Sequence, residues 1–212
     1  ATLLLVAGLL FSRPFFLSAA VPLFLLGLGG FVVAVALALW QTPATGTTLW
    51  AMRMAIGGLA VTVLLGSLLA EALAHGLSVP IVELTNIHLA WGLGGWALML
   101  LAGVSYHVVP MFQLTRPYPA SFARWFGPLL LVLLLAWSSR IFFGDARWSL
   151  AIALPLLLLL AAYAGITLWL QYTRRRKIHD ATSVYFRVSM LAMLAFAASA
   201  TALVLRPEIG AD

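Results

Sequence analysis

Long hydrophobic segments, separated by short polar or proline-containing turns, run through the whole chain. About 20 consecutive apolar residues cross the roughly 30 Å of hydrocarbon in a bilayer. Six segments reach that length, and we expect membrane spans at 15–40, 49–76, 82–112, 121–143, 147–172 and 183–205. A seventh segment, 1–12, is too short and reads as a partial or truncated helix. It has no charged n-region or small-residue cleavage site, so we predict no signal peptide.

Composition supports the same fold class. Hydrophobic residues make up 64% of the 212 residues and charged residues only 8%, whereas a soluble domain carries roughly a quarter charged residues. We therefore predict an all-α polytopic transmembrane helix bundle, one domain over 1–212, with the lipid bilayer as its surroundings. The chain has no cysteine, which excludes disulfides, iron–sulfur clusters and thiolate haem ligation. Sequence signatures of soluble hydrolases, zinc proteases and nucleotide-binding enzymes are also absent.

The charged residues predict a membrane orientation. Eight of the twelve basic residues lie at one set of helix ends, and five of the six acids accompany the other four. The net charge of +6 is therefore explained by topology and does not indicate nucleic-acid binding. We expect a bacterial inner-membrane protein, and the positive-inside rule predicts that loops 41–48, 113–120 and 173–182 lie in the cytoplasm. Loops 77–81 and 144–146 would then be periplasmic.

The span 82–112 carries an unusual stripe of residues. At 100° per residue one narrow face holds a histidine, small residues, a tyrosine and a proline. These are His88, Gly92, Gly95, Met99, Gly103, Tyr106 and Pro110. Leu93, on another face, is typical of a lipid-facing position. The stripe is shaped to receive either another helix or a flat ligand.

Two histidines near helix ends on the outer side are candidate metal ligands. Glu71 and His75 are spaced i, i+4, so the carboxylate can orient the imidazole. His75 and His88 lie on adjacent helix ends and could ligate one haem iron from opposite sides, with Gly92 and Gly95 making room for the porphyrin. The alternative is that both histidines hydrogen-bond to headgroups, water or backbone.

Arg140 is a further candidate for this site, whereas His107 and His179 are not. Arg140, at the outer end of its span, could bind haem propionates or a lipid phosphate, or it could pair locally with Asp145. His107 lies about 28 Å along the helix axis from His88, so the two cannot share one iron. Structural roles are the better prediction for His107 and for His179, which lies in a basic loop.

Part of this span resembles a known family. The residues that carry the resemblance are His88, Gly95, Trp96, Gly103, Tyr106 and Pro110. They are similar to the histidine-bearing helix of the heme-copper oxidase catalytic subunit, especially in C-family oxidases and nitric oxide reductases, and more loosely to NnrS proteins. The resemblance covers about 25 residues within 83–119 and departs at Ala90, where the family has a second histidine. It implies a reduced relative that binds haem b but has too few histidines for the copper site.

The leading functional expectation is therefore an integral membrane b-type haem protein for electron transfer or for chemistry of nitric oxide or oxygen. One alternative is a cofactor-free proton-coupled transporter, with Glu71 and His75 as the coupling site. Pro110 and Pro155 within helical segments favour this alternative, because broken helices often form substrate sites. The other is a structural subunit of a larger membrane complex or homo-oligomer, whose glycine stripe packs against a partner helix.

Overall fold

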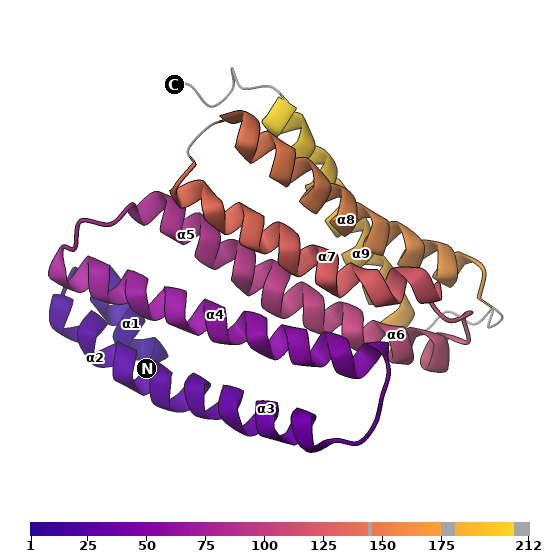
Figure 1. Ribbon diagram of the computed structural model, residues 1–212, viewed down its shortest axis with the longest axis horizontal. Helices are drawn as coiled ribbons and strands as arrows, with labels where there is room; N and C mark the ends of the chain where they lie inside the picture. Colours follow the sequence, from indigo (N-terminus) through magenta and orange to yellow (C-terminus); the bar gives the residue numbers. More distant parts are fainter. Residues whose placement is uncertain (144–145, 175–180, 206–212) are drawn as a thin grey trace. The chain divides into compact units, whose positions relative to one another are not determined.

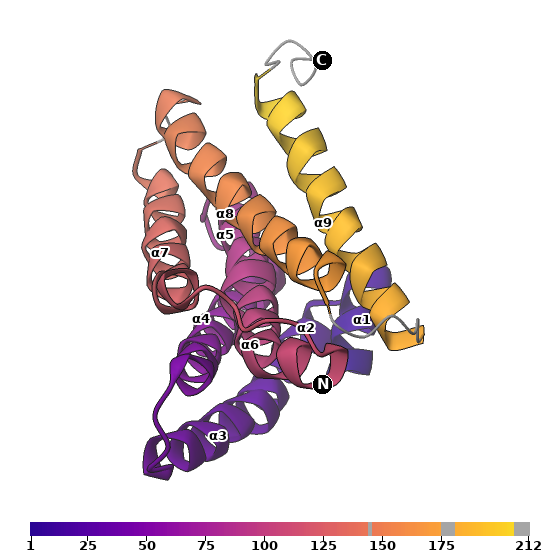
Figure 2. The same cartoon turned by 90° about the vertical axis from the view of Figure 1, so that its right-hand side faces the viewer.

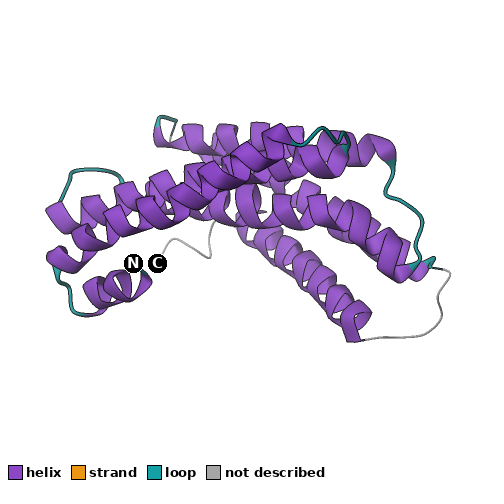
Figure 3. Cartoon of the chain, turned by 90° about the horizontal axis from the view of Figure 1, so that it is seen from below, coloured by secondary structure: helices purple, strands orange, loops and turns teal. Residues whose placement is uncertain are grey.

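A computed structural model describes residues 1–143, 146–174 and 181–205. Within these residues every regular element is a helix and none is a strand (Figure 3). Many apolar side chains on the helices are exposed, as expected where a helix faces lipid. Helices also pair their own backbone groups, which hydrocarbon requires. The predicted all-α bundle is confirmed.

Six helices of the described chain are long and apolar enough to cross a membrane. They are Pro14–Gln41, Thr47–His75, Ile81–Gln113, Ala120–Ile141, Arg147–Tyr172 and Ala181–Leu205. Each matches one predicted span, with bounds that differ by a few residues at most. A shorter helix, α1 (Thr2–Leu10), precedes them. The chain is a multi-pass membrane protein.

Two of the spans contain a π-helical segment that the sequence pattern did not predict. The first span consists of α2 (Pro14–Phe24), η1 (Leu25–Gly29) and α3 (Gly30–Gln41). The third consists of α5 (Ile81–Ala90), η2 (Trp91–Leu98) and α6 (Met99–Gln113). Both segments coincide with clusters of glycine, which has the freest backbone of all residues, and π segments are frequent at functional sites.

The chain divides into two compact units, Ala1–Leu100 and Leu101–Asp212. In the first unit α4 (Thr47–His75) is central: it packs against α2, α3, α5 and η2, while α1 packs on α2. Figure 1 shows α3 and α4 side by side, joined by a short loop. Ile56, Leu59 and Val63 of α4 form a buried cluster, and Trp96 packs against it.

The second unit contains most of α6, α7 (Ala120–Ser138), η3 (Ser139–Ile141), α8 (Ala146–Tyr172) and α9 (Ala181–Leu205). Helix α8 packs against both α7 and α9, and Figure 2 shows these long helices of the unit. Pro110 and Pro155 lie inside α6 and α8, which remain continuous. The broken helices expected for a transporter site are therefore not found at these prolines.

In each unit an arginine near the start of one helix hydrogen-bonds to a carbonyl in the last turn of the preceding helix. Arg53 donates from Nε and Nη2 to the carbonyl of Leu39, at 3.3 and 2.9 Å, and its guanidinium lies against the rings of Trp40 and Trp50. Arg187 donates from Nη2 to the carbonyl of Gln171 at 3.4 Å. Carbonyls in the last turn of a helix have no partner within it, so a cation there satisfies them.

Candidate functional site: a histidine beside an apolar cavity

The first unit contains a cavity of about 330 Å³ between α1, α2, η1, α4 and α5. Most of its lining is aliphatic or aromatic. The lining residues are Leu5, Leu9, Val21, Phe24, Leu28, Leu59, Thr62, Val63, Gly66, Ser67, Leu69, Ala70, Leu73 and His88. Its volume lies at the lower end of the range for small-molecule sites, which are mostly apolar with a few polar groups that orient the ligand.

His88 reaches this cavity because α4 has a glycine opposite it. A Cβ at Gly66 would lie only 2.9 Å from His88 Cε1, so the absence of a side chain lets the imidazole rest on the α4 backbone. The His88 Nδ1 atom is buried and has no hydrogen-bond partner within the described residues. An unsatisfied buried polar atom costs about 1–3 kcal/mol. The ring therefore has a nitrogen that is free to hydrogen-bond to a ligand or to ligate a metal.

Two other polar side chains line the cavity. The hydroxyl of Thr62 donates to the carbonyl of Gly58 at 2.8 Å, so its only proton is already used. The hydroxyl of Ser67 makes no hydrogen bond to any residue that the structure describes. The cavity therefore offers two polar groups to a ligand, His88 and Ser67.

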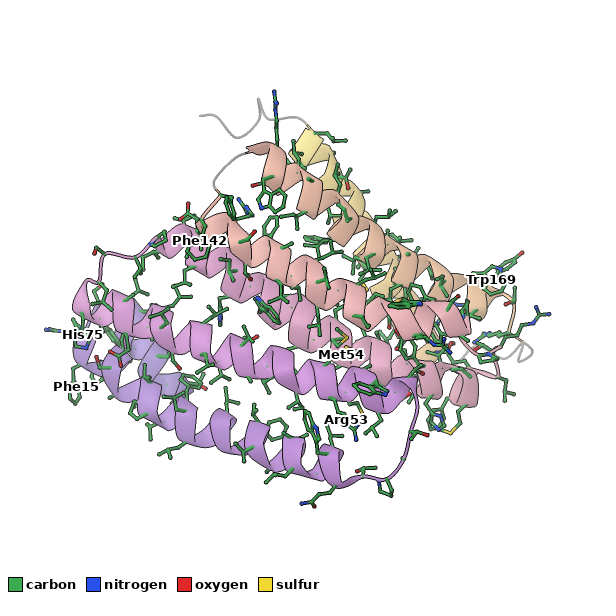
Figure 4. All side chains as sticks on the ribbon, in the orientation of Figure 1. Phe15, Arg53, Met54, His75, Phe142 and Trp169 are labelled. Carbon is green, nitrogen blue, oxygen red and sulfur yellow. The ribbon has the colours of Figure 1, made fainter. Side chains whose placement is uncertain are left out.

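The predicted pairing of Glu71 with His75 is confirmed. His75 Nε2 lies 3.1 Å from Glu71 Oε2 and 3.2 Å from the hydroxyl of Ser18 on α2. Figure 4 shows His75 at one end of α4, with Arg53 towards the other end of the same helix. His75 is 60% exposed and is not among the residues that line the cavity of His88. The structure thus does not bring the two histidines into one cavity, and the assignment of His75 as an iron ligand stays a prediction.

The glycine stripe of the third span packs against helix α4. A Cβ at Gly58 of α4 would overlap the backbone carbonyl of Gly95, and a Cβ at Gly92 would lie 3.3 Å from Thr62 Cγ2. Helix α4 therefore occupies the space that these glycines leave, where the sequence analysis had expected a porphyrin. Met99 on the same stripe is fully buried and Leu93 is exposed, so the predicted division into a packed face and an outer face is confirmed.

Arg140 belongs to the other unit. Its Nε donates to the Ser149 hydroxyl at 2.8 Å, and its guanidinium lies 4.1 Å from the ring centre of Trp137. The alternative partner, Asp145, lies outside the described residues, so that pairing is untested, as is propionate binding. His107 is exposed on α6, and His179 also lies outside the described residues.

The second unit holds buried polar contacts that the sequence analysis missed. Tyr163 of α8 bonds to Ser105 of α6 at 2.8 Å, and Gln171 of α8 bonds to Gln113 of α6 at 2.9 Å. The offset is 58 residues in both pairs, as parallel neighbouring helices require. The available signal was the spacing i, i+4, i+8 of Tyr163, Thr167 and Gln171 within an apolar helix, which puts three polar side chains on one face.

The directions of these hydrogen bonds follow from the single proton that each hydroxyl group carries. Ser105 and Thr167 each donate their one proton to a backbone carbonyl four residues earlier, at 2.6 and 2.7 Å. Tyr163 must therefore donate to Ser105, and Tyr118 must donate to Thr167 at 2.9 Å. Tyr118 comes from the 114–119 loop and is buried. Burial raises its pKa from 10.0 to about 12.

The comparisons with known proteins give no match. No family model matches the chain, no curated protein matches it, and no solved structure matches it. The similarity of 83–119 to the heme-copper oxidase helix therefore stays a prediction. Among the described residues, no three histidine, cysteine, aspartate or glutamate side chains gather where they could hold a metal ion.

Proposed function

We propose that this multi-pass membrane protein binds b-type haem in the cavity of the first unit, with His88 as an axial ligand to the iron. The observation that carries the proposal is the buried, unpartnered Nδ1 of a histidine that lines an apolar cavity. A neutral imidazole is a common haem ligand, and an intramembrane ionisable residue marks a functional site by default. The resemblance of 83–119 to the heme-copper oxidase helix favours the same cofactor.

The residues fit this group in part. His88 supplies one nitrogen, Ser67 a free hydroxyl, and the remaining walls are apolar except for Thr62. His75 is not in the lining, and its Nε2 contacts Glu71 and Ser18. The proposal therefore requires one protein ligand from this unit. The bound group would supply electron transfer or ligation of nitric oxide or oxygen, and the chain would hold it, orient it and exclude water.

The chemistry of His88 depends on its tautomer. A nitrogen that ligates iron must be unprotonated, so the proton of the neutral ring has to reside on the other nitrogen. The ring lies beside Gly66, whose missing side chain leaves the space that the imidazole occupies. We also propose the bacterial inner membrane as the location, with the sidedness that the positive-inside rule gives.

Rescue of a histidine variant tests the proposal. Protein purified from haem-replete cells should show a Soret band and the visible bands of reduced haem, which His88→Ala should lose. Added imidazole should restore them, because the truncated side chain leaves space for a free ligand beside the same cavity. His107→Ala, on an exposed position, is the matched control and should keep its bands. A colourless wild-type protein would refute haem binding.

A further inference from the structure

The cavity of the first unit is bounded partly by side chains that are themselves accessible from outside. Leu9 of α1 keeps 55% of its surface accessible, Leu28 of η1 39% and Leu73 of α4 48%. These residues come from three elements, two of them within membrane-spanning helices and one on an apolar short helix. These three lining residues are all aliphatic, and each keeps an accessible surface.

The polar groups of the cavity come from different walls. Ser67 and His88 belong to α4 and α5, and neither makes a hydrogen bond within the described residues. The elements α1, α2 and η1 contribute only leucine, valine and phenylalanine to the lining. An incoming molecule would therefore cross an apolar rim before it met a polar group. This order suits a molecule that is dissolved in lipid.

We propose that the cavity takes its ligand sideways from the bilayer, past Leu9, Leu28 and Leu73, and that Ser67 hydrogen-bonds to the polar part of that ligand. The ligand class is a lipid-soluble molecule with a mostly apolar body and one polar or metal-ligating group. The identification of this molecule as haem rests on the proposed function. The access route from the bilayer does not.

Photolabelling in liposomes tests the route. Chain purified from haem-depleted cells is reconstituted with a phospholipid whose acyl chain carries a diazirine at its middle, the sample is illuminated, and adducts are located by mass spectrometry. We expect adducts on residues inside the cavity, such as Ser67 and Val63, as well as on Leu64, which is 64% exposed on α4. Adducts on Leu64 alone would overturn the proposal.

Variants that fill the cavity supply the control. Ser67→Trp should abolish the cavity adducts and leave those on exposed Leu68, whereas Leu64→Trp, on an exposed position of the same helix, should retain the cavity adducts. Circular dichroism and gel filtration report whether each variant folds, and Val63→Phe is the substitute if Ser67→Trp does not. Cavity adducts that persist in a folded filling variant would show that the probe reaches these residues by another path.

Haemin separates this inference from the proposed function. When it is dissolved in the liposomes, it should suppress the cavity adducts in the wild type and not in His88→Ala. If cavity adducts form and haemin does not lower their yield, the lateral route is supported and haem is refuted as the ligand. Ser67→Ala should raise the haemin concentration needed for half-suppression. An unchanged value would refute the hydrogen bond from Ser67.

Discussion

The contact between α4 and η2 makes a sharp prediction at two adjacent glycines. Gly58 is buried, and any Cβ there would overlap the carbonyl of Gly95, whereas Gly57 is exposed and a Cβ there would meet nothing within 4 Å. Gly58→Ala must therefore push the two helices apart, and Gly57→Ala must not. The pair differs in packing while it shares helix, depth and chemistry.

The magnitude follows from two opposing terms. Overpacking a tight contact costs about 1–3 kcal/mol, and replacing a helical glycine by alanine gains roughly 0.5–1 kcal/mol from backbone entropy. Both variants share the second term. Gly58→Ala should therefore be less stable than Gly57→Ala by about 1–3 kcal/mol, and Gly57→Ala should equal or exceed the wild type.

Equilibrium unfolding by sodium dodecyl sulfate in mixed micelles, followed by circular dichroism, measures this difference. The two variants and the wild type are titrated under the same conditions, and their free energies of unfolding are compared. Equal stabilities of Gly57→Ala and Gly58→Ala would refute the close approach of α4 and η2. That result would also reopen the glycine stripe as a surface for a flat ligand.

Three further predictions concern single contacts. Gly66→Ala should shift or weaken the haem absorption bands with little loss of stability, because the added methyl group displaces the His88 ring; unchanged bands would contradict the contact. Since burial raises the folded pKa of Tyr118 from 10.0 to about 12, the free energy of unfolding should fall as pH rises from 10 to 12, by about 2–3 kcal/mol. Tyr118→Phe should reduce the alkaline fall by this amount, and a fall of unchanged size in Tyr118→Phe would assign it to other groups. Arg53→Lys should lower stability by roughly 1–2 kcal/mol, because a point charge cannot replace the two-pronged bond to the Leu39 carbonyl; a denaturant titration that shows no loss would refute this role.

The spans were predictable from the sequence because the bilayer imposes a length and a composition on each of them. The packed face of the third span was predictable for the same kind of reason: glycine and methionine on one side and Leu93 on the other indicate which side meets protein. The pairing of Glu71 with His75 followed from helical spacing alone. These features depend on residues close together in the chain.

Features that depend on contacts between helices were not predictable. The π-helical turns at Leu25–Gly29 and Trp91–Leu98 have no signal beyond clustered glycine. That Gly66 faces His88, and that the stripe accepts α4, depend on how two helices cross. The bond of Tyr118 to Thr167 joins a loop to a helix 49 residues away, so periodicity within one segment could not reveal it.

The candidate site shows the same division. The sequence singled out His88, but the cavity beside it also needs side chains from α1, α2, η1 and α4. His75 was paired with His88 because both lie near helix ends on one side of the membrane. Depth alone does not specify which helix faces which, and in the structure His75 contacts Ser18 of α2.

The most direct test of the account is the dithionite-reduced absorption spectrum of the purified wild type beside His88→Ala and His75→Ala. His88 lines the cavity and its Nδ1 is buried with no hydrogen-bond partner within the described residues, whereas His75 lies outside the lining and is largely exposed. The account predicts a Soret band and the visible bands of reduced haem in the wild type and in His75→Ala, and their loss in His88→Ala alone. Bands that survive in His88→Ala, or that are absent from the wild type, would contradict it.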